Sequence, residues 1–533
     1  MPTLRRPLSL TDRVSDYLRD RTALGRSLVK ISTELSRRRV PFHWSNAFGV
    51  VSLACVAVLF VSGLILMFFY TPSSELVTYR GSYAPLRGVE VSKAFESTMA
   101  ISFDVRGGLL LRQLHHWAAL LLPASIIIQL LVTFFTGGFR RPRQLTWVLL
   151  FLVLIAAMAG GWSGYALPDD MLAGTGLRIV QGIVLGIPVI GSWVSVLMFG
   201  GEFPGSIIEN LYPIHVLIVP AAIVALLAAR ARSSYVHKPA QFALPGRTEH
   251  NVVGVPMLPD AATRAAGLFG LVVGVLTLVS ATVTVSPIWH HGPADPANAS
   301  AGSQPDWYTG FLDGALRLVP PGWEFEWLGY TWTLAILLPL AVIGTFLLLV
   351  VLYPYIEGWI TRERRDHDIL DRPRNAATRT GIGVAGMVFY GVLWGAASAD
   401  IVATQFGLSL ESIIVGFRIV LLFGPVIALE VTRRVCLGLQ KKDREIALHG
   451  FETGRIVRLP GGEYVEVHQP LDRYERWRLV AHEHPVAEPL RPDQDGRLRL
   501  TERVRSRLAH WFFEYRVEPP TTGEALSGSR DRH

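Results

Sequence analysis

The sequence predicts an all-α, polytopic membrane protein, and two observations carry that prediction. Half of the 533 residues are hydrophobic and only 18 % are charged, a composition typical of proteins that cross a membrane several times. The apolar residues also gather in stretches of about 20, the length that crosses a ~30 Å hydrocarbon layer. Because backbone polar groups need internal partners in that layer, we expect each stretch to be a helix.

Eight stretches have this length and composition, so we expect eight transmembrane helices. They lie near residues 47–70, 109–136, 145–166, 211–231, 263–287, 328–356, 379–401 and 412–435. The chain then divides into four parts. These are an N-terminal arm (1–46), a four-helix bundle (47–231), a C-terminal transmembrane region (232–437) and a small C-terminal extension (438–533).

The loops alternate in charge. The arm (with Arg37), the loop after the second stretch (with Arg140), the loop after the fourth (with Arg232), the loop after the sixth (with Arg362) and the extension after Arg433 are basic. The other connections are neutral or acidic. Basic loops stay in the cytoplasm, so we predict that both termini are cytoplasmic and that the protein sits in the cell membrane.

The remaining connections also differ from one another. The outer loop 288–327 is long and rich in Pro and Gly, a length that usually indicates function. Residues 175–199 are apolar but broken by glycines, which favours helices on the membrane surface. In the C-terminal extension, Gly461 and Gly462 predict a short hairpin, and the charged, proline-rich sequence from about 470 predicts a disordered end.

Several classes of protein are disfavoured. The only cysteines, Cys55 and Cys436, lie far apart, which argues against thiolate metal sites, disulfide scaffolds and covalently attached haem. The net charge of +8 comes mostly from arginines beside apolar stretches, so we expect no nucleic-acid partner. The polar first 46 residues predict no cleavable signal peptide.

Histidines stand in two of the predicted helices: His115 and His116 in the second and His215 in the fourth. Histidine is costly in hydrocarbon, so it indicates a functional site. Two histidines at one depth on facing helices can supply the axial ligands of a b-type haem. The alternative is that each imidazole only forms a hydrogen bond. Gly63 and Gly164, at the same depth on the first and third helices, favour the haem, because glycine lets a flat ring approach the backbone.

The chain resembles the actinobacterial form of cytochrome b, the membrane subunit of the cytochrome bc complex that oxidises menaquinol. The resemblance runs from about residue 40 to residue 470. The segments that carry it are RGGLLLRQLHHWAAL, FFTGGFRRPR, GYALPDD, GRTEHNVVGV, SAGSQPDWY and GLQKKDREIALHGFETGRIVRLPGGEYVEVHQPL. It implies a haem-binding bundle of the first four helices, an iron–sulfur (Rieske-type) subunit and a cytochrome c subunit as partners, and a dimeric complex.

The resemblance also implies roles for individual residues. His115 and His215 match the two ligands of the outer haem, with Gly63, Gly164 and Arg112 packed around it. The family motif for quinol oxidation stands here as Pro305-Asp306-Trp307-Tyr308. Asp306 is expected to accept a proton, Tyr308 to position the quinol ring, and Pro305 and Trp307 to shape the pocket.

The inner haem of the family has no matching ligands in this chain. Its two histidines would follow fourteen or fifteen residues after His115 and His215, about 21 Å along each helix, where the chain has Gln129 and Arg230. Leu150 stands where the family has a glycine. Neither Gln nor Arg is an ordinary haem-iron ligand, so we predict one haem b, at the outer site, and no inner haem.

Two functions remain open after these departures. The chain is either a divergent subunit of a menaquinol:cytochrome c reductase, which we favour, or a non-bifurcating or non-catalytic paralogue with one haem and a role in assembly or regulation. The intact motif from Pro305 to Tyr308 favours the first. Gln129, Arg230 and Leu150 argue against the complete cycle. A secondary transporter is disfavoured because the sequence has no inverted repeat.

Overall fold

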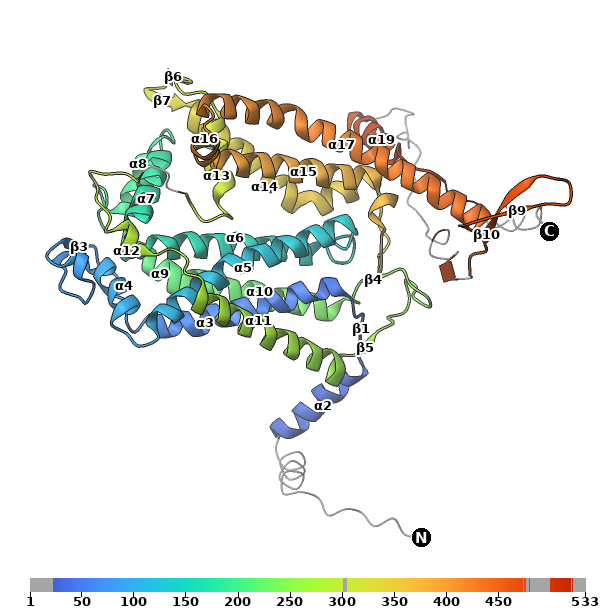
Figure 1. Cartoon of the computed structure of the whole chain (residues 1–533), viewed down its shortest axis with the longest axis horizontal. Coiled ribbons are helices and arrows are strands. Elements are labelled where there is room, and N and C mark those ends of the chain that lie inside the picture. Colours follow the sequence, from blue (N-terminus) through green and yellow to red (C-terminus); the bar gives the residue numbers. More distant parts are fainter. Residues whose placement is uncertain are drawn as a thin grey trace, which may run out of the picture.

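The computed structural model describes residues 23–300, 304–472, 474–475, 479, 499–518 and 520. Within them, eight helices are long and apolar enough to cross a membrane, which confirms the predicted number. These spans are Trp44–Leu66, Gly108–Phe135, Gln144–Ala166, Ile207–Val236, Met257–Thr282, Leu334–Thr361, Ala377–Ala397 and Leu410–His449. They run side by side along the long axis of the molecule (Figure 1).

The first four spans pack into one bundle. Its helices are α3 (Ala47–Leu66), α5 (Gly108–Phe135), α6 (Gln144–Ala166) and the run α9 (Ile207–Pro213), η3 (Ile214–Ile218) and α10 (Val219–Val236). Helix α5 contacts both α3 and α6, α6 contacts α10, and α11 (Ala262–Thr282) lies against α3 and α5. The bundle core is hydrophobic, with buried Leu122, Ile126 and Val153. The expected four-helix arrangement is therefore present.

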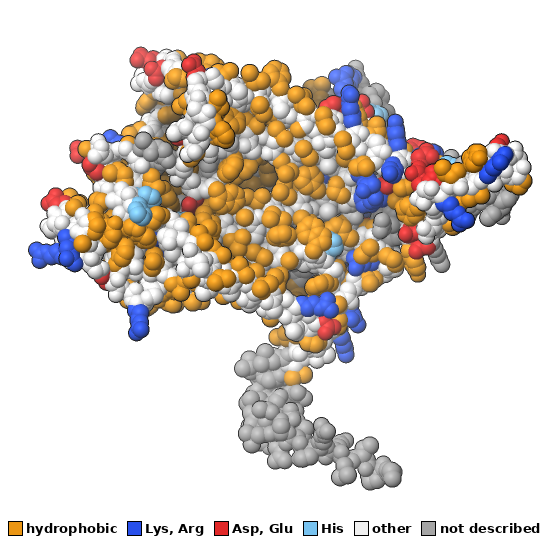
Figure 2. All heavy atoms as spheres, in the orientation of Figure 1, with side chains coloured by type: hydrophobic (Ala, Val, Ile, Leu, Met, Phe, Trp, Pro, Cys, Tyr) orange, Lys and Arg blue, Asp and Glu red, His pale blue; other side chains and the backbone are white. Residues whose placement is uncertain are grey.

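The last three spans form a second group beside the bundle, as Figure 1 shows. They are α14 (Leu334–Thr361), α15 (Ala377–Ala397) and α17 (Leu410–His449), with α13 (Gly310–Leu318) and α16 (Ala399–Phe406) at one end. Trp147 of α6 donates from Nε1 to the Val350 carbonyl of α14 at 3.0 Å, which joins the two groups. Figure 2 shows hydrophobic side chains over the middle of one face, as expected for a surface in contact with lipid.

The loops at the two ends of the spans differ in structure. At the end that holds the basic loops 136–143, 237–256 and 362–376, hereafter the basic end, short strand pairs join distant segments. They are β1 (Arg39–Val40) with β5 (Val255–Pro256), next to η1 (Trp44–Asn46) and the π-helical η4 (Met257–Ala261), and β4 (Gln241–Phe242) with β8 (Ile369–Leu370), next to η5 (Pro373–Asn375). Helix α2 (Ala23–Arg37) precedes β1.

The opposite end carries most of the loop structure. Its elements are β2 (Leu76–Thr78) paired with β3 (Glu90–Ser92), η2 (Ala84–Leu86), α4 (Lys93–Phe103), α7 (Met171–Leu185), α8 (Gly191–Phe199), α12 (Ile288–His291) and the hairpin β6 (Glu324–Trp327) with β7 (Tyr330–Thr333). Helices α7 and α8 confirm that residues 175–199 are helical. The Asp170 side chain accepts from the Ala173 N–H at 3.3 Å and so caps α7.

The C-terminal extension holds the predicted hairpin and one further helix. Strands β9 (Phe451–Arg458) and β10 (Tyr464–Gln469) pair antiparallel and project from the end of α17 (Figure 1). Helix α19 (Leu500–Phe513) returns to the body, where Arg433 of α17 bonds Glu514 at 2.9 Å. The sequence from about 470 onward was predicted to be disordered at its end, and residues 521–533 lie outside the described residues.

Candidate functional site

The structure brings His115 of α5 and His215 of η3 together inside the bundle, with their ring planes at 64° to each other. Their ring centroids lie 6.1 Å apart. A metal–imidazole bond is about 2 Å long, so one iron atom between two imidazoles needs a centroid separation of roughly 6 Å once the ring radii are added. The two histidines therefore stand at the spacing of an axial pair.

Hydrogen bonds orient both imidazoles. His115 Nδ1 lies 3.0 Å from the Ser62 hydroxyl, and His215 Nδ1 lies 3.0 Å from the Gly160 carbonyl and 3.2 Å from the Ser163 hydroxyl. Because these partners occupy Nδ1, each ring keeps Nε2 available for a metal, the arrangement that outer-shell partners usually impose. His215 lies in a π-helical turn directly after Pro213. Such turns recur at functional sites.

Glycines make room for the rings. A Cβ at Gly63 would lie 3.1 Å from His115 Cε1, and a Cβ at Gly164 would lie 2.5 Å from His215 Cε1. The second distance is shorter than real Cβ contacts, so a side chain at Gly164 would displace His215. Both predicted glycines therefore pack against the predicted ligands.

The histidines line a cavity of about 320 Å³, whose walls also include Gly63, Gly164 and Arg112. Arg112 donates from Nη2 to the Ser286 carbonyl at 3.1 Å, while its buried Nε has no hydrogen-bond partner among the described residues. A cation with an unused donor suits the propionate of a haem. The histidine pair, the glycine walls and this arginine together fit a b-type haem.

The Pro305–Tyr308 segment lies next to the same space, which Asp306 helps to line. The Tyr308 hydroxyl donates to Asp306 Oδ2 at 2.7 Å, and the tyrosine ring is 1 % exposed. Burial and the neighbouring carboxylate raise the pKa of Tyr308, so it stays a donor at neutral pH. Trp307 donates from Nε1 to the Leu120 carbonyl at 3.3 Å, which holds the segment against α5.

Other residues of the site were not predicted from the sequence. His116 Nε2 lies 3.4 Å from Asp306 Oδ1, so the histidine next to His115 faces the Pro305–Tyr308 segment. A Cβ at Gly161 would lie 2.0 Å from the Tyr308 hydroxyl, so this glycine makes room for Tyr308. The serines that bond the two imidazoles, Ser62 and Ser163, were also missed. Each serine directly precedes one of the two predicted glycines, and this is the one sequence signal that could have indicated them.

At the inner position the bundle is filled by protein side chains. Arg230 Nη2 donates to Gln129 Oε1 at 3.2 Å, and Gln129 Nε2 donates to the Ser52 hydroxyl at 2.8 Å. The Ser52 and Ser125 hydroxyls lie 2.7 Å apart. We call this hydrogen-bonded chain of four residues the polar plug. It links α10, α5 and α3 across the interior of the bundle.

The wall around the polar plug is closed as well. Leu150 is 4 % exposed and belongs to the hydrophobic core of the bundle. A Cβ at Gly49 would meet Gln129 Oε1 at 3.7 Å. None of Gln129, Arg230 and Leu150 lines the space that contains His115 and His215. These side chains supply no imidazole at this depth of the bundle.

A membrane-spanning four-helix bundle with facing histidines and glycine-lined walls defines the class of b-type cytochromes. The family model "Cytochrome b(N-terminal)/b6/petB" matches residues 120–293. A relative from Streptomyces coelicolor, "Cytochrome bc1 complex cytochrome b subunit", is 43 % identical over 96 % of this chain and 95 % of its own length. A protein of the same name from Mycobacterium tuberculosis is 45 % identical over 84 % of this chain and 80 % of its own.

The chain thus belongs to the family of cytochrome b subunits of the cytochrome bc1 complex. A solved structure titled "Hyperthermophilic respiratory Complex III" aligns with a TM-score of 0.57 and 18 % identity, over 78 % of this chain and 98 % of that one. At that identity the likeness supports the fold. Family membership implies haem b as the cofactor.

Proposed function

We propose that the chain is the quinol-oxidising subunit of a menaquinol:cytochrome c reductase and that it holds one haem b. The observation that carries the proposal is the position of Asp306. Asp306 lines the same cavity as His115 and His215. A quinol bound there would meet a proton acceptor and an electron acceptor in one pocket.

His115 and His215 would hold the haem, and Arg112 would bind its propionate. When bound, this group supplies a one-electron acceptor. The oxidation of one quinol releases two electrons and two protons, and the second electron needs another acceptor. In the family, that acceptor is an iron–sulfur subunit. A Rieske-type subunit and a cytochrome c subunit are therefore part of the proposal, as is a dimeric complex.

Asp306 is proposed to take a quinol proton, and Tyr308 to position the ring. The Tyr308 hydroxyl bonds Asp306 Oδ2 at 2.7 Å and fixes the carboxylate. Oδ1 then faces the pocket and His116 at 3.4 Å. Because a held carboxylate needs no reorganisation when it accepts a proton, this geometry suits a general base. Pro305 and Trp307 are proposed to shape the pocket around the ring.

The single haem is the finer part of the proposal. The polar plug supports it, since Gln129 and Arg230 are bonded to each other where two iron ligands would stand. Buried Leu150 occupies the third wall. Electrons at the outer haem would then face a gap of about 21 Å, the distance along the helices to Gln129 and Arg230. This gap also favours the second candidate function, a non-bifurcating or non-catalytic paralogue with a role in assembly or regulation.

The proposed orientation places the basic end and both termini in the cytoplasm. Arg140, Lys238 and Arg365 lie at that end, and Figure 2 shows Lys and Arg gathered there. Basic residues beside spans set this orientation. Asp306 and the outer haem would then lie near the outer face, where the partner subunits collect electrons.

The haem content of the purified protein tests the single-haem proposal. We expect one haem b per chain by pyridine haemochrome analysis, because only one position offers two imidazoles. His115→Ala or His215→Ala should remove it, whereas His116→Ala should keep it. Two haems per chain would contradict the proposal, and haem retained in both ligand variants would refute the assignment of the ligands.

The rate of quinol oxidation tests the catalytic proposal. Asp306→Asn keeps the shape of the side chain but removes the base, so we expect the rate with a menaquinol analogue to fall by roughly 10² or more. The haem spectrum should not change. Asp313→Asn, in α13 of the same outer segment, serves as a matched control and should keep most of the rate. An Asp306→Asn protein as active as the parent would favour the non-catalytic paralogue.

A further inference from the structure

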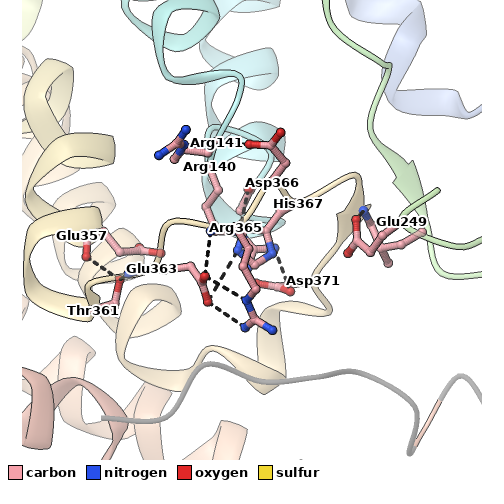
Figure 3. A network of polar contacts seen from close by, with 12 residues as sticks. Arg140, Arg141, Glu249, Glu357, Thr361, Glu363, Arg365, Asp366, His367 and Asp371 are labelled. Carbon is pink, nitrogen blue, oxygen red and sulfur yellow. Dashed lines mark hydrogen bonds and ion pairs between the residues drawn. The ribbon is translucent and has the colours of Figure 1, made fainter. Parts of the chain in front are cut away.

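A second large cavity, of about 920 Å³, lies at the basic end, far along the spans from Asp306. Its walls come from the α5–α6 loop, the segment after α10 and the segment between α14 and α15, and residues at and after the end of α19 also line it. Figure 3 shows part of the polar network that surrounds it, with Arg141, Asp366 and His367 close together. The proposed haem binding and quinol oxidation use none of these residues.

Most carboxylates of this cavity are already engaged. Asp371 pairs with Arg140 at 2.9 Å and with Arg379 at 2.8 Å, and Arg379 also holds Glu357 at 2.6 Å. Glu363 pairs with Arg365 at 2.8 Å. Asp368 pairs with Arg143 at 3.0 Å. Glu249 accepts hydrogen bonds from the backbone N–H groups of Asp368 and Ile369. The last acid, Asp366, is 62 % exposed.

Three basic side chains of the cavity are engaged less closely. Arg141 is half-exposed, and its guanidinium lies 3.8 Å from Asp366. Lys238 is also half-exposed, with Nζ 3.9 Å from Asp368. His367 is buried, its Nε2 has no hydrogen-bond partner among the described residues, and the nearest carboxylate oxygen, of Glu363, is 3.8 Å away. All three separations exceed hydrogen-bond length.

His367 belongs to the short segment Asp366–His367–Asp368, and Arg141 and Lys238 lie beside it. Hydrogen bonds to backbone groups hold these parts together. The His367 N–H donates to the Arg141 carbonyl at 2.8 Å. Arg143 donates to the Lys238 carbonyl at 3.0 Å and also to the His367 carbonyl. The backbones that carry the three donors are therefore linked by hydrogen bonds. This preorganisation lowers the entropy cost of binding a ligand.

We propose that this cavity binds a phosphate group through Arg141, Lys238 and His367. Two cations and an imidazole N–H supply donors for a tetrahedral oxyanion, and Arg and Lys are the usual residues at such sites. Asp368 does not oppose the anion, because Arg143 neutralises it. Asp366 is solvent-exposed and can turn away. The phosphate would bridge the four-helix bundle and the segment that leads into α15.

The phosphate group has two natural sources at this position. One is the headgroup of an anionic phospholipid, since the cavity opens near the ends of the spans. The other is a soluble phosphate compound from the aqueous side. Both present the same oxyanion to the same three donors.

Thermal unfolding of the purified full chain, in the complex with which it is isolated, tests the proposal. The protein is measured in chloride, in inorganic phosphate at equal ionic strength, and in nanodiscs of phosphatidylcholine with or without phosphatidylglycerol. The test variant is Arg141→Gln/Lys238→Gln. The matched control is Arg364→Gln, an exposed base of the same loop that does not line the cavity.

We expect phosphate, phosphatidylglycerol or both to raise the Tm of the parent and of the control. Each lost charge-assisted contact should weaken binding by roughly tenfold, so the double variant should lose most of this rise while its Tm in chloride stays close to that of the parent. A response to phosphatidylglycerol alone assigns the site to a lipid headgroup, and a response to phosphate alone assigns it to a soluble ligand. An equal rise in the parent and the double variant, or no rise in the parent, would overturn the proposal.

Discussion

At the scale of single residues, the side chains of the site fit because each of them packs against a glycine. Gly63 and Gly164 face the two imidazoles, and Gly161 faces the Tyr308 hydroxyl. The first two were predicted because their depth matches that of the histidines. Gly161 was not predicted, because its role depends on the contact of Tyr308, a loop residue, with α6. The two residues are far apart in the sequence, so no spacing indicates that they meet.

Gly161→Ala should slow quinol oxidation without loss of haem. The added Cβ would lie 2.0 Å from the Tyr308 hydroxyl, so Tyr308 must move and release Asp306. Misplacement of about 1 Å at a reacting group can cost 10² in rate, and we expect a decrease of at least tenfold. The assay is quinol oxidation at fixed haem content. Gly182→Ala, in α7 with open space around its Cα, is the control, and equal rates in the two variants would contradict this role of Gly161.

At the scale of elements, length and hydropathy were sufficient for the spans but not for the segments between them. The eight spans follow from apolar stretches that must satisfy their own backbone. Helix α19 was not predicted, because its sequence is charged and proline-rich segments precede it. It is placed by contacts with distant residues, such as the hydrogen bond from Arg433 Nη2 to the Trp511 carbonyl at 3.3 Å. Only the folded chain brings those residues together.

The segment between α14 and α15 should make stability depend on pH. Burial, with Arg140 as the next cause, lowers the pKa of His367 from 6.5 to about 4. The unfolded chain therefore binds more protons than the folded one between these values, and the contribution of neutral His367 is lost as pH falls from about 6.5 to 4. The difference amounts to at most about 3 kcal/mol. The hydrogen bond with Arg365 lowers the pKa of Glu363 to about 2, so a further loss of stability begins as pH falls below its ordinary value of 4.5.

Thermal unfolding between pH 7 and pH 4.5 measures this dependence. We expect the Tm of the parent to fall across this range, and the fall should be shallower in His367→Gln, which cannot titrate. His250→Gln, at another histidine of the same cavity, is the control and should follow the parent. A His367→Gln protein with the full slope would place the pH dependence elsewhere.

At the scale of the whole molecule, the proposed single haem depends on the residues that stand in the bundle about 21 Å along the helices from the histidine pair. The resemblance could indicate which residues stand at the inner position, but it could not show how they contact one another. In the structure, Arg230, Gln129, Ser52 and Ser125 form one chain of hydrogen bonds. The plug gives partners to the Gln129 amide and to the two serine hydroxyls, which would be costly to bury unpaired in a membrane. Arg230 Nε is buried without a partner among the described residues.

The replacement of the plug should therefore restore a second haem site. In Gln129→His/Arg230→His/Leu150→Gly, two imidazoles would face each other about 21 Å along the helices from the outer pair, and the loss of Leu150 would open the wall opposite Gly49. We expect the haem content to rise from one toward two per chain, with a second step in a redox titration. Leu150→Gly alone should leave the count at one, since it adds no ligand. If the triple variant folds, as judged by its intact outer haem, and still holds one haem, then the inner position lacks more than these three side chains.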